Sequence, residues 1–203
     1  MIAYKDFIVS PIGKRYNNSK KIGDKSLILN TEVYNHQFVN RRARVIATPL
    51  LFSSPINVGD EVIVHHNVFR RWHDVKGRER NSSSYYKEDK YIISESQMFL
   101  YKQNDEWKAM PGYSFVKPLK STNKLTNEEE KPLVGVVKYS DGTFNNFYTK
   151  ELVGFTPNSE YEFIVDKERL YRVMNKFITI KYEYKGDEEE YNPSWAQSCC
   201  RTN

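Results

Sequence analysis

The feature that most constrains the fold of this chain is residues 56–67, which read Ile-Asn-Val-Gly-Asp-Glu-Val-Ile-Val-His-His-Asn. The Val-Gly-Asp segment predicts a tight turn, because glycine takes positive φ at no steric cost and aspartate can bond to its own backbone. The run at residues 61–64 is rich in β-branched side chains and predicts a strand. A turn that leads directly into such a run is typical of an antiparallel sheet.

Residues 90–101, Lys-Tyr-Ile-Ile-Ser-Glu-Ser-Gln-Met-Phe-Leu-Tyr, continue this pattern. They predict a strand at residues 91–93, a polar turn at residues 94–96 that caps one helical turn, and a closing strand at residues 98–101. Aromatic residues make up 14% of the chain, and no long amphipathic helical pattern is present. We therefore expect an all-β fold.

Composition limits the functional classes. A chain of 203 residues that is 39% hydrophobic can bury a core, and its length suits one large or two small domains. The net charge of +5, from 31 bases and 26 acids, permits an acidic partner but is modest. The two cysteines, Cys199 and Cys200, are adjacent and unsuited to an ordinary disulfide, and no signal peptide or membrane-spanning run is evident. We expect a cytoplasmic protein without a membrane partner.

An aliphatic tripeptide stands in a polar segment between the strands predicted at residues 4–12 and 41–48. This tripeptide consists of Leu27, Ile28 and Leu29, and residues 14–26 before it are almost free of apolar side chains. One interpretation is a short core strand. The other is an exposed apolar anchor on a flexible loop, which becomes ordered when it docks in the groove of a partner.

Residues 68–87 form a basic insertion, predicted to be a surface loop or a protruding hairpin. Its basic residues alternate with aromatic residues. Basic side chains contact phosphate groups and aromatic rings stack on nucleobases, so this pattern is typical of nucleic-acid binding. A solvated hairpin whose aromatic residues pack on the sheet is the other interpretation, and we expect no nucleic-acid binding above the background of a basic surface. The possible basic contact surface consists of Arg70, Arg71, Arg78 and Arg80.

The pattern of the first half recurs in the second. Residues 113–119 resemble residues 4–12, residues 133–137 resemble 43–47, and residues 151–158 resemble 61–67. Residues 170–174 and 177–182 resemble the closing strands. Two tandem copies of one barrel fit this recurrence better than one large fold. We expect a first barrel at residues 1–106, a second at residues 107–186 and an acidic, aromatic C-terminal tail at residues 187–203.

The order of strand, loop with aliphatic tripeptide, strand, turn and closing strands resembles the GroES-type co-chaperonins. The residues that carry the resemblance are Val58-Gly59-Asp60-Glu61-Val62-Ile63 and Ile93-Ser94-Glu95-Ser96. It implies two tandem GroES-like, partly open β-barrels that cap a GroEL-type chaperonin ring and assist ATP-dependent folding of an unfolded client protein. It also implies that Leu27, Ile28 and Leu29 bind the chaperonin, with no cofactor of the chain's own.

The chain departs from that family in several places. Residues 120–131 of the second copy have Leu125 alone and no tripeptide, and Val-Gly-Asp is missing before Val153. Where the family has a roof hairpin, this chain has only residues 49–55. Viral co-chaperonins are similar in this respect, so the resemblance implies a phage member that acts in the host cytoplasm. An open roof would leave more room for a large client.

Assembly into a homo-oligomeric ring follows from the same resemblance, because open edge strands must be paired or covered. The expected edges of the second copy are residues 115–118 and 177–181. The expected edge strands of the first copy consist of Phe7, Ile8, Val9, Met98, Phe99 and Leu100.

Catalysis and metal binding find little support. The four histidines, His36, His65, His66 and His73, have neither the order of a catalytic triad nor usual zinc-ligand spacing, even together with the adjacent cysteines. We expect no enzyme, no metal and no cofactor. Two other classes stay open: a phage virion or assembly component built on the same barrels, and a single-stranded nucleic-acid binder acting through the basic insertion.

The C-terminal tail has two interpretations. It is either a solvated terminus, or a peptide whose Tyr191 and Trp195 anchor on the first barrel or on a neighbouring subunit. In the second interpretation, the acids would meet basic side chains of the first barrel, namely Arg41, Arg42 and Arg44.

Overall fold

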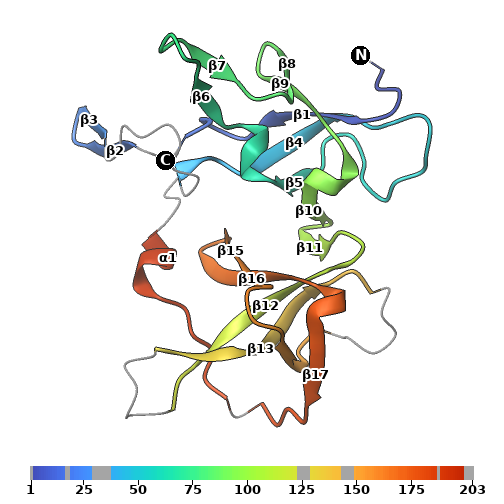
Figure 1. The fold of residues 1–203 in the computed structure, drawn as a ribbon, viewed down its shortest axis with the longest axis vertical. Helices are drawn as coiled ribbons and strands as arrows, with labels where there is room; N and C mark the ends of the chain where they lie inside the picture. The colour runs from blue at the N-terminus through green and yellow to red at the C-terminus, as the bar shows by residue number, and fades with distance from the viewer. Residues whose placement is uncertain are drawn as a thin grey trace. The chain divides into compact units, whose positions relative to one another are not determined.

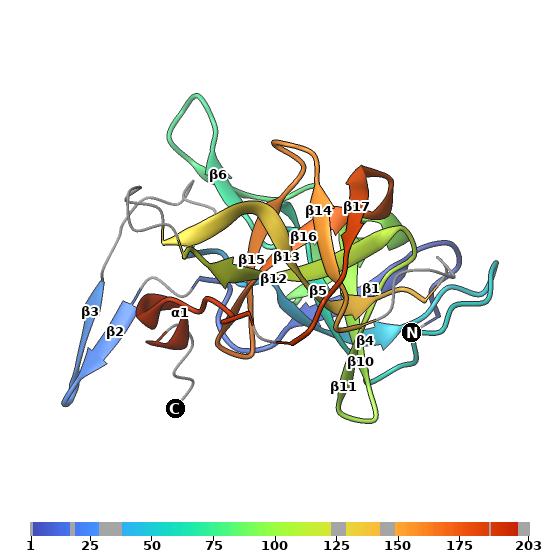
Figure 2. The same ribbon diagram turned by 90° about the horizontal axis from the view of Figure 1, so that it is seen from below.

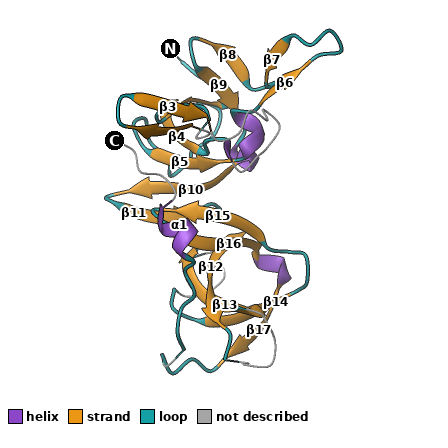
Figure 3. Cartoon of the chain, turned by 90° about the vertical axis from the view of Figure 1, so that its left-hand side faces the viewer, coloured by secondary structure: helices purple, strands orange, loops and turns teal. Residues whose placement is uncertain are grey.

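The computed structural model describes residues 2–16, 19–28, 38–122, 129–142, 149–186 and 188–198. The chain divides into two compact units, Met1–Trp107 and Lys108–Asn203, called here the first and second unit. Nearly all regular structure is β-strand (Figure 3), and each unit is built on an open, barrel-like antiparallel sheet that does not close. The predicted all-β fold with partly open barrels is confirmed.

The first unit contains a seven-stranded sheet in the order β11-β10-β5-β4-β1-β9-β8 (Figure 1). Two separate hairpins, β2–β3 and β6–β7, branch from it, and among the described residues the 3₁₀ turns η2 and η3 connect its strands. The elements are β1 (Phe7–Pro11), β2 (Ser19–Ile22), β3 (Lys25–Ile28), β4 (Arg42–Ala47), β5 (Glu61–Val64), η2 (His66–Val68), β6 (Arg71–His73), β7 (Glu79–Asn81), β8 (Tyr85–Lys87), β9 (Lys90–Ile93), η3 (Glu95–Gln97), β10 (Met98–Gln103) and β11 (Glu106–Ala109).

The second unit contains a six-stranded sheet in the order β15-β16-β12-β13-β14-β17. A short helix, α1, packs against β16, and one 3₁₀ turn, η4, precedes the last strand. The elements are β12 (Tyr113–Lys120), β13 (Glu130–Ser140), β14 (Leu152–Phe155), β15 (Tyr161–Val165), β16 (Glu168–Met174), η4 (Asn175–Phe177), β17 (Ile178–Tyr182) and α1 (Ser194–Ser198). Within the described residues, no helix is long and apolar enough to cross a membrane.

The two sheets have the same strand order. When β1, β4, β5, β8, β9 and β10 are matched to β12, β13, β14, β15, β16 and β17, the first sheet becomes the second plus one extra strand, β11. The hairpins β8–β9 and β15–β16 even turn alike, through Glu88-Asp89 and Asp166-Lys167, all four at positive φ. The chain therefore contains one β-fold twice, as the sequence recurrence indicated.

Local chemistry explains the elements around the Val-Gly-Asp turn. Gly59 takes a φ of +97°, which a residue with a side chain rarely adopts, and Asp60 accepts a bond from the backbone N–H of Asn57 at 2.8 Å. The predicted strand follows as β5. The polar turn after β9 forms η3, where the Gln97 side chain accepts from the backbone N–H of Ser94.

The structure corrects the expected edges of the first barrel. β1 lies between β4 and β9, and β10 lies between β5 and β11, so neither strand has a free backbone edge. The expected edge residues are instead core residues: Phe7, Ile8, Val9, Met98, Phe99 and Leu100 are all buried. The strands predicted as partners of a neighbouring subunit are paired within their own sheet because β9 and β11 cover them.

In the second unit, only one of the two expected edges is an edge. β12, which contains residues 115–118, is interior to its sheet, whereas β17 ends it. Gly135 explains how closely β12 and β13 approach: a Cβ atom there would lie 2.5 Å from the carbonyl oxygen of Lys117. Only glycine fits this position without moving a strand.

Candidate functional site

The loop that carries the aliphatic tripeptide leaves the first sheet through a fixed base. Tyr16 and Val39 form an antiparallel bridge, and the backbone N–H of Asn40 donates to the carbonyl of Arg15 at 2.9 Å. The buried Asn40 amide donates to the carbonyls of Ile12 and Lys14, at 2.8 and 2.9 Å. These bonds tie both ends of the loop to one point of the sheet.

Arg15 connects this base to the rest of the unit. Its guanidinium donates to the carbonyl of Phe69 at 3.0 Å and to the side-chain oxygen of Asn81 at 2.8 Å. It also lies 5.5 Å from the centre of the buried Tyr91 ring. The base is therefore a rigid platform from which the loop projects.

Within the loop, β2 and β3 form a separate hairpin, visible as a pair of blue arrows in Figure 2. Gly23 takes a φ of +59° in the turn between them, and Ser19 pairs with Ile28 at the far end. The Leu27 side chain is 54% exposed, so it belongs to no core, although the segment is a strand. Ile28 ends β3, and Leu29 lies outside the described residues.

The corresponding connection of the second unit is much shorter. Lys120 pairs with Glu130, and the backbone N–H of Ser121 donates to the carbonyl of Glu129 at 3.0 Å. The β12–β13 loop thus closes at residues 121 and 129, whereas the first loop closes at residues 16 and 39. The two units therefore differ in the length of this connection.

A second apolar surface of the first unit lies on the connection at residues 49–55. Leu50 and Leu51 are 67% and 58% exposed, and their backbone N–H groups donate to the carbonyl of Tyr4 at 3.1 Å. Phe52 is partly exposed beside them and contacts the ring of Phe7. The sequence pattern had indicated only a short connection at these residues.

The basic insertion is a hairpin, as predicted, but its charges are partly balanced. Arg71 lies 2.9 Å from Glu79 across β6–β7, and Arg80 lies 3.1 Å from Asp74. The N–H of Trp72 donates to a backbone carbonyl of the same hairpin. Arg78 contributes its backbone N–H to Asp74, and this bond lowers the pKa of the Asp74 carboxyl. Arg70 directly precedes β6 and is half-buried.

The described histidines, His65, His66 and His73, do not converge on a site, and His36 lies outside the described residues. His65 accepts from the backbone N–H of Asn67 at 3.1 Å, and its ring lies 4.2 Å from that of His66. No group of three or more His, Cys, Asp or Glu side chains arranged for a metal occurs in the part of the chain that the structure describes. Cys199 and Cys200 lie outside that part.

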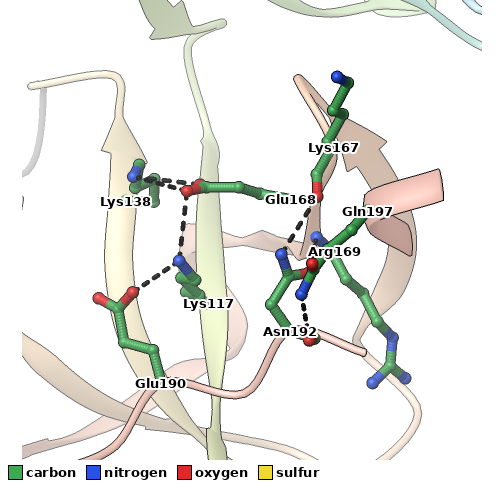
Figure 4. Close-up of polar contacts among 8 residues, drawn as sticks. All are labelled: Lys117, Lys138, Lys167, Glu168, Arg169, Glu190, Asn192 and Gln197. Atoms are coloured by element: carbon green, nitrogen blue, oxygen red, sulfur yellow. Dashed lines mark hydrogen bonds and ion pairs between the residues drawn. The ribbon is translucent and has the colours of Figure 1, made fainter. Parts of the chain in front are cut away.

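The acidic tail packs on the second unit. Three consecutive acids each meet a different lysine: Glu188 lies 2.6 Å from Lys131, Glu189 lies 3.0 Å from Lys120, and Glu190 lies 2.6 Å from Lys117. Figure 4 shows the pair of Glu190 and Lys117. The described part of the tail, residues 188–198, is therefore not a solvated terminus. The prediction that the acids meet arginines of the first barrel is wrong for the described acids, and Arg42, one of those arginines, pairs with Glu61.

Arg169 on β16 holds the end of the same segment. Its backbone N–H donates to the side-chain oxygen of Asn192 at 3.1 Å, and its guanidinium lies 6.0 and 5.8 Å from the Tyr191 and Trp195 rings. Glu130 and Glu162 balance its charge, at 2.6 and 2.8 Å. Lys117 and Arg169 could not be predicted as contact residues, since a lone basic residue on a strand carries no signal of its partner.

No protein-family model matches this chain, and no curated protein matches it. Two features of the chain itself therefore point to a function: the anchored loop of the first unit and the paired acidic tail of the second.

Proposed function

We propose that this protein is a cytoplasmic, oligomeric co-chaperonin of the viral type, which docks on a chaperonin ring through the loop of its first unit. The observation that carries the proposal is the combination of a fixed loop base with an exposed aliphatic side chain, Leu27, on β3. A loop of this kind offers a hydrophobic anchor to the apolar groove of a partner.

The energy available from such an anchor is sufficient for reversible docking. Full burial of one aliphatic side chain contributes about 1.5–3 kcal/mol, so a Leu-Ile-Leu tripeptide offers roughly 5–9 kcal/mol before the cost of ordering the loop. Several loops in one oligomer raise the overall affinity without new contacts. Each loop can therefore bind weakly while the complex as a whole stays together until the chaperonin's ATP cycle releases it.

The second unit would not dock in the same way, because its corresponding loop closes between residues 121 and 129 and has no aliphatic tripeptide. The basic hairpin supports the nucleic-acid alternative less well than its composition indicated, since Glu79 and Asp74 pair with two of its arginines. Docking through the first loop is the function that these features favour.

The test replaces Leu27, Ile28 and Leu29 together by serine and measures co-elution with a GroEL-type ring in the presence of nucleotide. We expect the wild-type chain to co-elute and the triple variant to lose the complex while keeping its circular dichroism. The matched control replaces Leu50, Leu51 and Phe52 by serine, which removes three other apolar side chains of the first unit. Retention of the complex by the loop variant, or equal loss in the control, would contradict the assignment.

A further inference from the structure

One strand of the second unit lacks a full-length neighbour in its own sheet. β12 pairs with β13 along one side, but on its other side β16 reaches only residues 113–116. The rest of that side is filled by the tail: the backbone N–H of Lys120 donates to the carbonyl of Glu189, and the backbone N–H of Tyr191 donates to the carbonyl of Pro118, both at 2.8 Å. Leu119 and Glu190 form the bridge between them. Within the acidic segment, residues 188–198, residues 189–191 thus lie along β12 as a short added strand held by this one bridge.

The side chains around this added strand select an acidic sequence. Lys117 is 9% exposed and lies between Glu190 and Glu168, as Figure 4 shows. Glu168 is also the partner of Lys138, at 3.1 Å. Without Glu190, two amines would share one carboxylate in a half-buried setting, and an uncompensated buried charge is costly. This side of β12 therefore requires a carboxylate from the segment that covers it.

Asn192 fixes the register of the acidic segment against the sheet. The Asn192 side chain donates to the carbonyl of Lys167 and accepts from the backbone N–H of Arg169, both at 3.1 Å. Figure 4 shows Asn192 between these two backbone groups, with Gln197 donating to its carbonyl. Such bonds place the acids one by one opposite their lysines. Residues 117, 120, 131 and 169 are called here the lysine–arginine groove.

Most contacts of the acidic segment are polar and reversible. Among its described residues only Pro193 and Ala196 are buried, while Trp195 is 50% exposed. Of its three ion pairs, that of Glu189 with Lys120 is the most exposed, and an exposed ion pair is weak and is screened by salt. Residues 183–186, which precede the segment, belong to no strand. A segment held in this way can leave its site without unfolding the sheet.

We propose that the lysine–arginine groove is a peptide-binding site for an acidic, extended segment, and that one copy of this chain can donate its acidic segment to the groove of another. The same residues make the same contacts whether the segment comes from its own chain or from a second copy. Exchange of an identical element between copies is a low-cost route to association. This site is independent of the chaperonin-docking loop.

The first experiment uses the full chain and a labelled peptide with the sequence of residues 187–198. In a tail-reversed variant, Glu188→Lys/Glu189→Lys, the chain's own segment is repelled, and we expect the peptide to bind more tightly than it does to the wild type. In a groove-reversed variant, Lys120→Glu/Lys131→Glu, binding should be about tenfold weaker or worse than in the tail-reversed variant, because two ion pairs become repulsions. Fluorescence anisotropy measures both.

The matched control adds Lys150→Glu/Lys176→Glu to the tail-reversed variant, which changes two exposed lysines of the second unit outside the groove. Peptide binding should stay close to that of the tail-reversed chain. If the peptide fails to bind a folded tail-reversed chain, or binds the groove-reversed chain equally well, the proposal is overturned. Chaperonin docking would be unaffected by either result.

Two further measurements test whether the acidic segment detaches and is donated between copies. Tail-reversed and groove-reversed copies have complementary segments and grooves, so their mixture should yield mixed complexes in native mass spectrometry. Persistence of unmixed species alone would refute donation between copies. In the wild type, amide hydrogen exchange at Lys120 should accelerate several-fold with added salt. Exchange at the Val137 amide of β13, which donates to the carbonyl of Glu151, should not change. Equal behaviour of the two amides would contradict a detachable segment.

Discussion

Replacement of Gly135 by alanine tests the closest strand approach in the second unit. The added Cβ would lie 2.5 Å from both the carbonyl oxygen of Lys117 and a methyl carbon of Val116, about 0.9 Å inside the 3.4 Å at which ordinary contact begins. The oxygen belongs to the backbone of β12, so relief requires a shift of one strand rather than of a side chain. Overpacking of this kind costs about 1–3 kcal/mol, and alanine's smaller unfolded-state entropy offsets only part of it.

Hydrogen exchange resolved by peptide measures this cost separately in each unit. A loss of about 2 kcal/mol raises exchange through global opening roughly thirtyfold, and we expect this in β12, β13 and β16 but not in the first unit. Gly154→Ala is the matched control, because the nearest atom there, at 3.1 Å, is on the partly exposed Tyr182 ring, which can move. Unchanged protection in Gly135→Ala, or an equal effect of both variants, would refute the assigned β12–β13 packing.

Two further predictions concern polar groups. Burial lowers the pKa of the Lys117 amine, but its bonds to Glu190 and Glu168 outweigh this effect and raise the pKa above 10.5. The contribution of these ion pairs to folding stability is therefore complete below pH 10.5 and is lost as the pH rises through the folded-state pKa. The difference in urea midpoint between wild type and Lys117→Met should shrink above that pH, and a constant difference would contradict the ion-pair role. Asn40→Ala should destabilise the first unit by about 1–3 kcal/mol, because two carbonyls at the loop base lose their donor. Exchange at the Arg42 amide, which donates to Asn40, reports this change, and unaltered exchange would show that the loop base does not depend on Asn40.

The sequence was sufficient for the strands with strong local patterns. Val-Gly-Asp followed by a β-branched run specified both a turn and β5, and the polar residues before β10 specified η3. The recurrence in the second half predicted the matching strand order of the two sheets. These elements were predictable because turn chemistry and side-chain pattern act over a few residues.

Edge status could not be predicted, because it depends on which strands meet from distant parts of the chain. β10 looks like the last strand of a barrel, but the turn at Asn104-Asp105, both at positive φ, returns the chain as β11 and covers it. The residues of this turn and of the turns at 88–89 and 166–167 are Asn, Asp, Glu and Lys. None contains the glycine that usually marks a two-residue hairpin turn.

The candidate sites also contain features that the sequence could predict and features that it could not. Leu27 was predictable as an exposed anchor or a core strand from its polar surroundings, and its exposure decides against the core. The acidic tail was predictable as a charged segment, but its partners were not. Lys117 and Lys120 on β12 and Lys131 on β13 converge on it only after the sheet has formed.

The duplication gives a physical reason why the two proposed sites fall in different units. In the first unit the β1–β4 connection is long, and hydrogen bonds from the Asn40 side chain fix its base to the sheet. In the second unit the β12–β13 connection closes early, and the acidic segment pairs with the uncovered part of β12. β12 has Lys117 and Lys120 at the positions that match residues 10 and 13 of the first unit. Those residues are Ser10, in β1, and Gly13, just after it, so the first unit has no lysine at either position. The same strand order can therefore present a docking loop in one copy and a peptide groove in the other, because only the connections and a few strand residues differ.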